Sequence, residues 1–267
     1  MDLAAAHAPP PLHDLLGASF VFNATITGLA WDGDAACFTL ADGSVARLTA
    51  AWTGAPRLAP RPGGGVEIIA AAAPPPPPVI IAPPEGGTVS GGAEGCSPVL
   101  CRTNDGTVIA MVKPGGGVAL RSPGSNSWTD LDVPVAASSM AITSADILVI
   151  GGAEGVYLWE RATGLRHFAI AFGMRHAVAP VACHPRLGLI ACADRTGAIV
   201  LGRPEVREVM LIRAAGSPPT MLEFAPTGEA LAFATTDGEA GTMLLPDLLF
   251  RPITSGTDPE PERHDER

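Results

Sequence analysis

The chain has 267 residues, of which 47% are hydrophobic and 16% charged, and its formal net charge is −10. The 16 arginines are scattered and the only lysine is Lys113, so the chain lacks the basic face that nucleic acids and anionic membranes require. The 31 glycines and 27 prolines lie between apolar segments, which indicates many tight turns rather than a collagen-like repeat.

The first residues predict neither a secretory signal nor a membrane span. Residues 1–18 lack a basic start and a long apolar core, and we expect them to form a flexible lead. The chain contains no run of eighteen apolar residues. An odd count of five cysteines argues against a disulfide framework. Together these features predict a cytoplasmic, monomeric protein.

Short apolar segments separated by turns follow the lead. Residues 19–24 predict a strand, and three more are predicted at 26–30, 36–40 and 44–48. The Asp42-Gly43 pair between the last two is a strong hairpin signal. The proline- and glycine-rich runs at 62–65, 74–78 and 114–117 predict loops between strands. Residues 102–106 and 107–112 predict a strand, a turn and another strand.

The second half of the chain is more regular. Strands are predicted at 178–183, 189–193 and 198–201, and again at 220–224, 230–235 and 242–245. The glycines that end the second turn of each repeat, Gly155, Gly197 and Gly238, lie 42 and 41 residues apart. A period near forty residues built from short strands is typical of a β-propeller.

These observations predict an all-β protein with one β-propeller over residues 19–252. About 22 strands, at four per blade, favour six blades, with five or seven as alternatives. We expect the N-terminal strand to complete the last blade and close the ring, which would remove two exposed sheet edges. Residues 253–267 are polar and acidic, and we expect them to be disordered.

Two stretches carry a resemblance to a known family. Residues 224–228 (Phe-Ala-Pro-Thr-Gly) and 231–238, which end in Asp237-Gly238, are similar to a WD40 repeat. Residues 155–164 match the third strand of such a repeat, with Trp159-Glu160 in place of the usual Trp-Asp. The likeness touches most of residues 19–250 and resembles the degenerate WD40-like proteins of bacteria.

The chain also departs from that family. Other repeats lack the terminal Trp-Asp, and the Gly-His pair that opens WD40 repeats is absent from the sequence. The hydrogen-bonded tetrad of regular WD40 blades is therefore not expected in most blades. The resemblance implies a rigid, non-catalytic platform for protein partners, without a cofactor or a metal.

Few residues suggest chemistry of their own. His184 follows Cys183 and lies near Asp194, but no second Cys or His has zinc-ligand spacing, so we interpret His184-Pro185 as a turn. Cys96 and Cys101 could pair only if the fold brought them together. Regularly spaced acids end the turns and are interpreted as turn formers rather than a carboxylate array. These are Asp42, Glu94, Glu154, Asp194 and Asp237.

The glycine runs at 63–65 and 115–117 are not phosphate loops, since Lys113 precedes its glycines instead of following them. The large aromatic residues near predicted loops are more informative. Trp31, Trp52 and Trp128 are candidate anchors for a protein partner, because exposed aromatic side chains often anchor interfaces.

An enzyme is the alternative. Six-bladed propeller hydrolases and lactonases act on small molecules with a divalent cation, which requires acids and amides over the central channel. The chain has only three asparagines, Asn23, Asn104 and Asn126. Three or more acids, amides or histidines converging at one channel mouth would favour the enzyme.

Overall fold

The computed structural model describes residues 17–49, 57–60, 66–70, 78–81, 100–152, 155–168, 178–204, 206–213 and 215–245. Every regular element in these ranges is a β-strand, and there are 22 of them. Twenty of the strands form five antiparallel units of four, and β5 (Arg57–Pro60) and β6 (Val66–Ala70) pair only with each other.

The units follow the order of the chain. The unit nearest the N-terminus holds β2 (Ile26–Asp32), β3 (Ala35–Leu40), β4 (Val45–Thr49) and β7 (Val79–Ile81). The next holds β8 (Leu100–Arg102), β9 (Ile109–Val112), β10 (Val118–Arg121) and β11 (Thr129–Leu131). The third holds β12 (Ala137–Ile142), β13 (Leu148–Gly152), β14 (Gly155–Glu160) and β15 (Gly164–Phe168).

The fourth unit holds β16 (Val178–Cys183), β17 (Ile190–Asp194), β18 (Ile199–Arg203) and β19 (Val206–Arg213). It joins the third unit through the bridge between Gly152 and Val178. The last unit holds β20 (Pro219–Phe224), β21 (Ala230–Thr235) and β22 (Glu239–Leu244). Its fourth strand is β1 (Gly17–Val21), which pairs antiparallel with β22.

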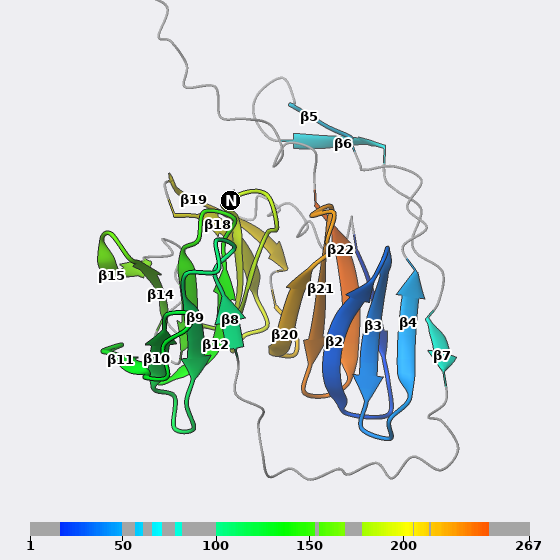
Figure 1. Cartoon of the computed structure of the whole chain (residues 1–267). Helices are drawn as coiled ribbons and strands as arrows, with labels where there is room; N and C mark the ends of the chain where they lie inside the picture. Colours follow the sequence, from blue (N-terminus) through cyan, green and yellow to red (C-terminus); the bar gives the residue numbers. More distant parts are fainter. Residues whose placement is uncertain are drawn as a thin grey trace, which may run out of the picture.

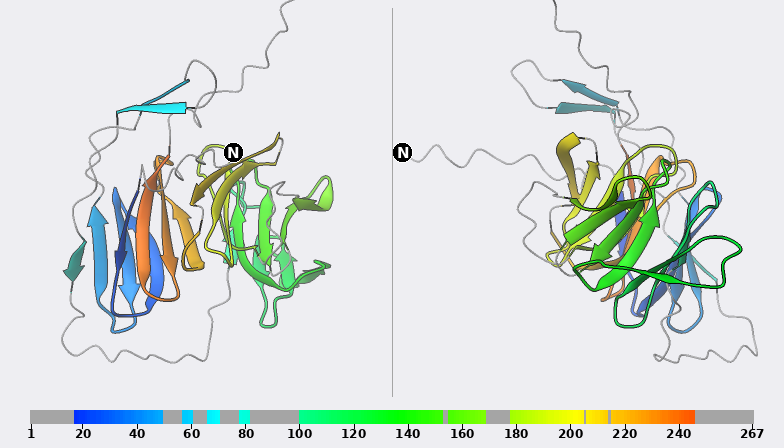
Figure 2. Two further views of the ribbon diagram at one scale, coloured as in Figure 1. Left: turned by 180° about the vertical axis from the view of Figure 1, so that it is seen from behind. Right: turned by 60° about the vertical axis from the view of Figure 1, so that its left-hand side comes forward.

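Neighbouring units meet at their first strands, in the spatial order second, third, fourth, last and first. Strand β12 contacts β8 and β16, β20 contacts β16, and β2 contacts β20. Figure 1 shows β20–β22 between β2–β4 on one side and the β8–β19 strands on the other, and the views in Figure 2 agree. Four-stranded antiparallel sheets that meet at their first strands are the arrangement of propeller blades. The described fold is therefore all-β and propeller-like.

The hydrophobic core is divided among the interfaces between units. One cluster packs β8–β10 against β12 and β13, and a second packs β13–β15 against β16–β18. A third joins the fourth unit to β20–β22, and the last joins β21 and β22 to β2–β4. The middle strands β13, β17 and β21 each belong to two of these clusters and are thus covered on both faces. This explains why β13, β17 and β21 are buried along their whole length, without the alternation of a half-exposed strand.

The second turns of four of the five units have a recurring form, and that of the third unit lies outside the described residues. At the β17–β18 turn the Gly197 N–H donates to the carbonyl oxygen of Asp194, and the Asp194 N–H donates to the carbonyl oxygen of Ala198. The corresponding glycines Gly43, Gly116 and Gly238 have φ values of 84°, 85° and 86°, and that of Gly197 is 82°. Glycine adopts this left-handed backbone without the cost that a Cβ would add. This turn explains the recurrent glycines Gly43, Gly197 and Gly238, whereas Gly155 begins β14 with a φ of 152°.

The first turns of neighbouring units are joined at two of the junctions. The Asn104 Nδ2 donates to the carbonyl oxygen of Thr143, 3.1 Å away, in the next unit. Between the fourth and last units, Nε2 of His184 lies 3.1 Å from the carbonyl oxygen of Gly228. The His184 Nδ1 accepts the main-chain N–H groups of Arg186 and Leu187 at 3.1 and 2.9 Å. The histidine therefore holds its own turn and joins two units.

The His184 contacts predict a pH-dependent stability. Burial lowers the pKa of His184 below its ordinary value, so the unfolded chain binds the proton more tightly. As the pH falls below about 6.5, the free energy of unfolding should decrease, by at most about 1.4 kcal/mol per pH unit from this residue. Urea unfolding at several pH values should show this loss in the wild type and a weaker one in His184→Asn, which cannot titrate. Identical pH profiles for the two proteins would contradict the assignment.

Most predicted strands agree with the structure to within one or two residues. The predicted segments 178–183 and 230–235 coincide with β16 and β21, and the predicted pairing of the N-terminal strand with the last sheet is observed. That strand begins at Gly17, two residues before the predicted start and inside the predicted lead. The described residues form five four-stranded units, whereas six blades were favoured. Residues 253–267 lie outside the described ranges.

Candidate functional site

The three candidate tryptophans have different surroundings. Trp31 on β2 is partly buried in the core cluster shared with β21 and β22, and its Nε1 donates to the carbonyl oxygen of Glu223 at 3.2 Å. It thus joins two units. Trp52 lies outside the described residues. Trp128 is half-buried beside a pocket, and the guanidinium carbon of Arg121 lies 4.8 Å from its ring centroid. The role of each as a partner anchor stays a prediction.

The residues near His184 do not form a reactive group. Its ring nitrogens both contact main-chain groups, and burial raises the pKa of the Cys183 thiol. The Asp194 carboxylate accepts the N–H groups of Thr196 and Ala198 in its own turn. Burial also raises the pKa of Cys101 to about 11, so that thiol is protonated at neutral pH, and Cys96 lies outside the described residues.

The turn acids that the structure describes accept hydrogen bonds within their own turns, and Asp237 also accepts one from Ser217 outside its turn. Asp42 accepts the N–H and the hydroxyl of Ser44 at 2.9 and 2.6 Å. Asp237 accepts the hydroxyls of Ser217 and Thr235, and these hydrogen bonds lower the pKa of its carboxyl. Glu94 and Glu154 lie outside the described residues. Across the described ranges, no three His, Cys, Asp or Glu side chains lie close enough together to hold a metal ion.

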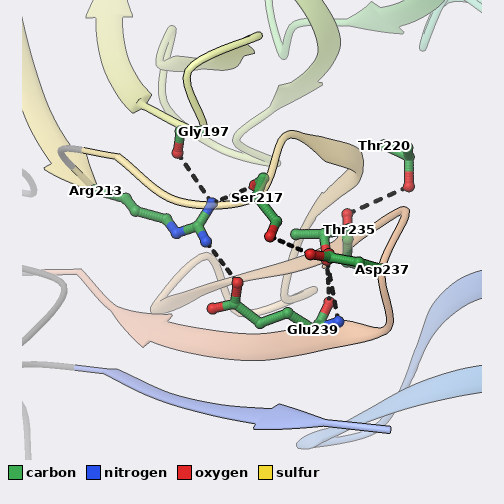
Figure 3. A network of polar contacts seen from close by, with 8 residues as sticks. Gly197, Arg213, Ser217, Thr220, Thr235, Asp237 and Glu239 are labelled. Atoms are coloured by element: carbon green, nitrogen blue, oxygen red, sulfur yellow. Dashed lines mark hydrogen bonds and ion pairs between the residues drawn. The ribbon is translucent and has the colours of Figure 1, made fainter. Parts of the chain in front are cut away.

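The most extensive polar network centres on a buried arginine (Figure 3). Arg213, at the end of β19, donates from Nη1 to the carbonyl oxygens of Gly197 and Ser217 at 3.0 and 2.8 Å. Its Nη2 donates to Oε2 of Glu239 on β22 at 2.7 Å. The Arg213 side chain is 4% exposed and that of Glu239 is 18% exposed. Because the guanidinium is committed to three acceptors from two units, this network is structural.

A pocket of about 250 Å³ lies between the β10–β11 loop and the end of β14. Its polar lining carries two arginines and four hydroxyls, from Arg121, Arg161, Ser122, Ser125, Ser127 and Thr129. Its apolar lining is Val108, Leu120 and Trp159. The lining thus combines an aromatic surface with cationic and hydroxyl groups, which is a composition suited to binding a polar ligand.

The β10–β11 loop is shaped by its own sequence. Ser122-Pro123-Gly124-Ser125 forms a turn in which the Ser125 N–H donates to the carbonyl oxygen of Ser122 at 3.1 Å. Proline favours the second position of such a turn, and Gly124 takes the positive φ of 81° that the third position needs. The strand pairing places Leu120 opposite Thr129, so the next residues, Arg121 and Trp128, meet at the end of the hairpin. The loop is therefore held in one conformation beside the pocket.

The opposite wall comes from the next unit. Trp159 on β14 packs partly against the core cluster between the second and third units. Arg161 follows β14, and its Nη2 donates to the carbonyl oxygen of Thr107 at 3.1 Å. This contact fixes Arg161 across the junction between the two units. The pocket therefore depends on the units being packed together.

The sequence singled out Trp128 and Trp159 but missed Arg121 and Arg161. Arg121 and Arg161 are forty residues apart, so they do not form a cluster along the sequence. A hairpin pairing across Pro123-Gly124 would have placed Arg121 opposite Trp128. The approach of Arg161 depends on how two units pack, and no local pattern encodes that.

No helix in the described ranges has the length and apolar character needed to cross a membrane.

No family model matches the chain, and no curated protein matches it. Among solved structures, the chain is similar to a catalytically inactive virginiamycin B lyase from Staphylococcus aureus, crystallised with quinupristin. The TM-score is 0.47 with 12% identity, over 82% of this chain and 80% of the lyase chain. It is also similar to a chain of the mitotic checkpoint complex, with a TM-score of 0.46 and 14% identity, over 83% of this chain and 62% of that one.

Proposed function

We propose that this protein is a non-catalytic, WD40-like interaction platform that docks a protein partner at the β10–β11 pocket. The observation that carries the proposal is the pocket itself, about 250 Å³ in volume, with Trp159 in its wall. Aromatic side chains beside arginines are the groups that most often anchor a protein interface. The polar contacts elsewhere in the described fold are committed to turns and junctions, as for His184 and Arg213.

The proposal includes a closed ring of six blades. The pairing of β1 with β22 supports closure, because it completes the last sheet with a strand from the opposite end of the chain. Leu100 on β8 is 58% exposed, and a further blade packed against β8 would bury it. The proposal retains the sequence-based prediction of a monomeric, cytoplasmic protein that binds neither nucleic acid nor membranes.

The test is capture of partners by the tagged protein in lysate of its own organism, quantified by mass spectrometry. Wild type and Arg47→Gln, which removes an exposed ion pair with Asp32 within the β2–β4 unit, away from the pocket, should capture the same proteins. Trp128→Ala should lose at least about 90% of that capture if its ring is an anchor worth about 2 kcal/mol. The variant must unfold at the same temperature as wild type. Unchanged capture by a folded Trp128→Ala would refute docking at this pocket.

A further inference from the structure

The charge of the pocket lining indicates which ligand it takes. Two of its nine lining residues are arginines and none is an aspartate or glutamate, although the whole chain has a net charge of −10. A guanidinium pair in a partly enclosed site favours an oxyanion, which arginine binds through paired, charge-assisted hydrogen bonds. We propose that the pocket binds the phosphoryl group of a phosphorylated segment of the protein partner, an inference that rests on the proposed function.

Arg121 supplies the first donor group. The guanidinium of Arg121 lies over the Trp128 ring, with its carbon 4.8 Å from the ring centroid. This contact sets the orientation of the guanidinium plane. Its Nε is buried, yet among the described residues it has no hydrogen-bond partner. A buried N–H without an acceptor costs free energy. Because this nitrogen has almost no accessible surface, the Arg121 side chain must turn toward the pocket before a ligand oxygen can accept its hydrogen.

Arg161 supplies the second donor group. Among the described residues it donates one hydrogen bond, from Nη2 to the carbonyl oxygen of Thr107, and a guanidinium has five N–H groups. The Asp105 carboxylate interacts with the charge of Arg161 but makes its hydrogen bonds within its own loop. It accepts the N–H and hydroxyl of Thr107 at 2.8 and 2.9 Å, and these and related hydrogen bonds, more than the charge of Arg161, lower the pKa of Asp105. The guanidinium therefore remains available to an anion.

Serine hydroxyls favour a phosphoryl group over a carboxylate. The Ser125 and Ser127 Oγ atoms lie 2.9 Å apart, and the Ser127 N–H donates to Ser125 Oγ. Both line the pocket with Ser122. Two arginine forks with several hydroxyls offer more donors than the two oxygens of a carboxylate need. A phosphoryl group has three terminal oxygens and about two negative charges at neutral pH.

Titration of capped tripeptides tests the proposal. The indole N–H signals of Trp128 and Trp159 in ¹⁵N-labelled protein would be followed by NMR with acetyl-Ala-phosphoserine-Ala-amide, and with the same peptide carrying serine or glutamate. The phosphoserine peptide should shift both signals saturably. It should bind at least about tenfold more tightly than the glutamate peptide, a difference equivalent to one charge-assisted hydrogen bond. Affinity should fall between pH 7.5 and 5, as the phosphoryl group gains a proton near pH 6.

Variants distinguish binding by the pocket arginines from a general effect of the protein's net charge. Arg121→Gln and Arg161→Gln should each weaken phosphoserine binding at least about tenfold, whereas Arg47→Gln, with the same change in net charge, should not. If the glutamate peptide bound as tightly as the phosphoserine peptide, the preference for a phosphoryl group would be refuted. If inorganic phosphate bound as tightly as the phosphoserine peptide, recognition of a phosphorylated peptide would be refuted. If no peptide binds while Trp128→Ala still abolishes partner capture, this inference fails and the proposed function stands.

Discussion

Gly116→Ala should lower the free energy of unfolding by about 3 kcal/mol or more, whereas Gly115→Ala, at the adjacent residue, should lower it by about 1 kcal/mol. Both glycines lie in the β9–β10 turn and have nearly the same left-handed backbone, with φ values of 85° and 88°. An alanine at either position therefore carries the same conformational cost. The two substitutions differ only in the space around the new methyl group.

That space is set by the connection between units. A Cβ on Gly116 would lie 2.8 Å from the Cα of Ala136, whereas one on Gly115 would meet nothing within 4 Å. The Gly116 carbonyl also accepts the N–H of Ala137 at 2.8 Å, which holds the connecting segment against the turn. Main-chain atoms cannot rotate away as a side chain could, so the connection itself must move. That displacement adds to the cost of the left-handed backbone.

At the corresponding turns, too, the cost of an alanine should depend on whether main-chain atoms lie close to the new Cβ. A Cβ on Gly197 would lie 2.2 Å from the carbonyl oxygen of Gly216, and one on Gly238 would lie 2.4 Å from that of Phe22. Gly33, in the β2–β3 turn, has a φ of 63° and open space. Urea unfolding of all five glycine-to-alanine variants should separate them into two groups. Equal losses at Gly115 and Gly116 would show that the connection does not press on the turn.

Arg213→Met should destabilise the protein by about 3 kcal/mol, because it leaves the mostly buried Glu239 carboxylate without its ion-pair partner. It also removes the donor to two main-chain carbonyls, those of Gly197 and Ser217. The measurement is the free energy of unfolding in urea at pH 7.

Two further variants identify the cause. Glu239→Gln combined with Arg213→Met should recover part of the loss, since the unpaired charge is then absent. Arg213→Lys keeps the charge but lacks the planar guanidinium that reaches three acceptors. Its free energy of unfolding should therefore remain well below that of the wild type. If Arg213→Lys were as stable as the wild type, the charge alone would be important and not the geometry of the network.

The sequence predicted the fold to the extent that local patterns determine it. Asp42-Gly43 and Asp237-Gly238 marked hairpins, and the turns around Gly43 and Gly238 have the positive φ that selects glycine. The apolar run at 230–235 marked a middle strand, and β21 is buried along its whole length. The number of units was harder to predict, because the proline- and glycine-rich runs between residues 50 and 100 obscured the repeat in the sequence.

The candidate site was predicted less well than the fold. Trp31 was grouped with Trp128 because both lie near turns, yet its indole N–H is used at the junction with β20. The arginines of the pocket and the Arg213–Glu239 pair gave no signal along the chain. Residues 121 and 161, and 213 and 239, belong to different strands or units, and their contacts appear only when those elements pack.

The sequence alone determined the strands, the turns and the repeat, because hydrophobic pattern and backbone preference act over a few residues. Only the tertiary structure decided why particular glycines are indispensable, which tryptophan lies beside a pocket, and which arginines converge there. These properties depend on the packing of one unit against the next. A side chain's solvent exposure and its unmet hydrogen bonds are defined only by that packing.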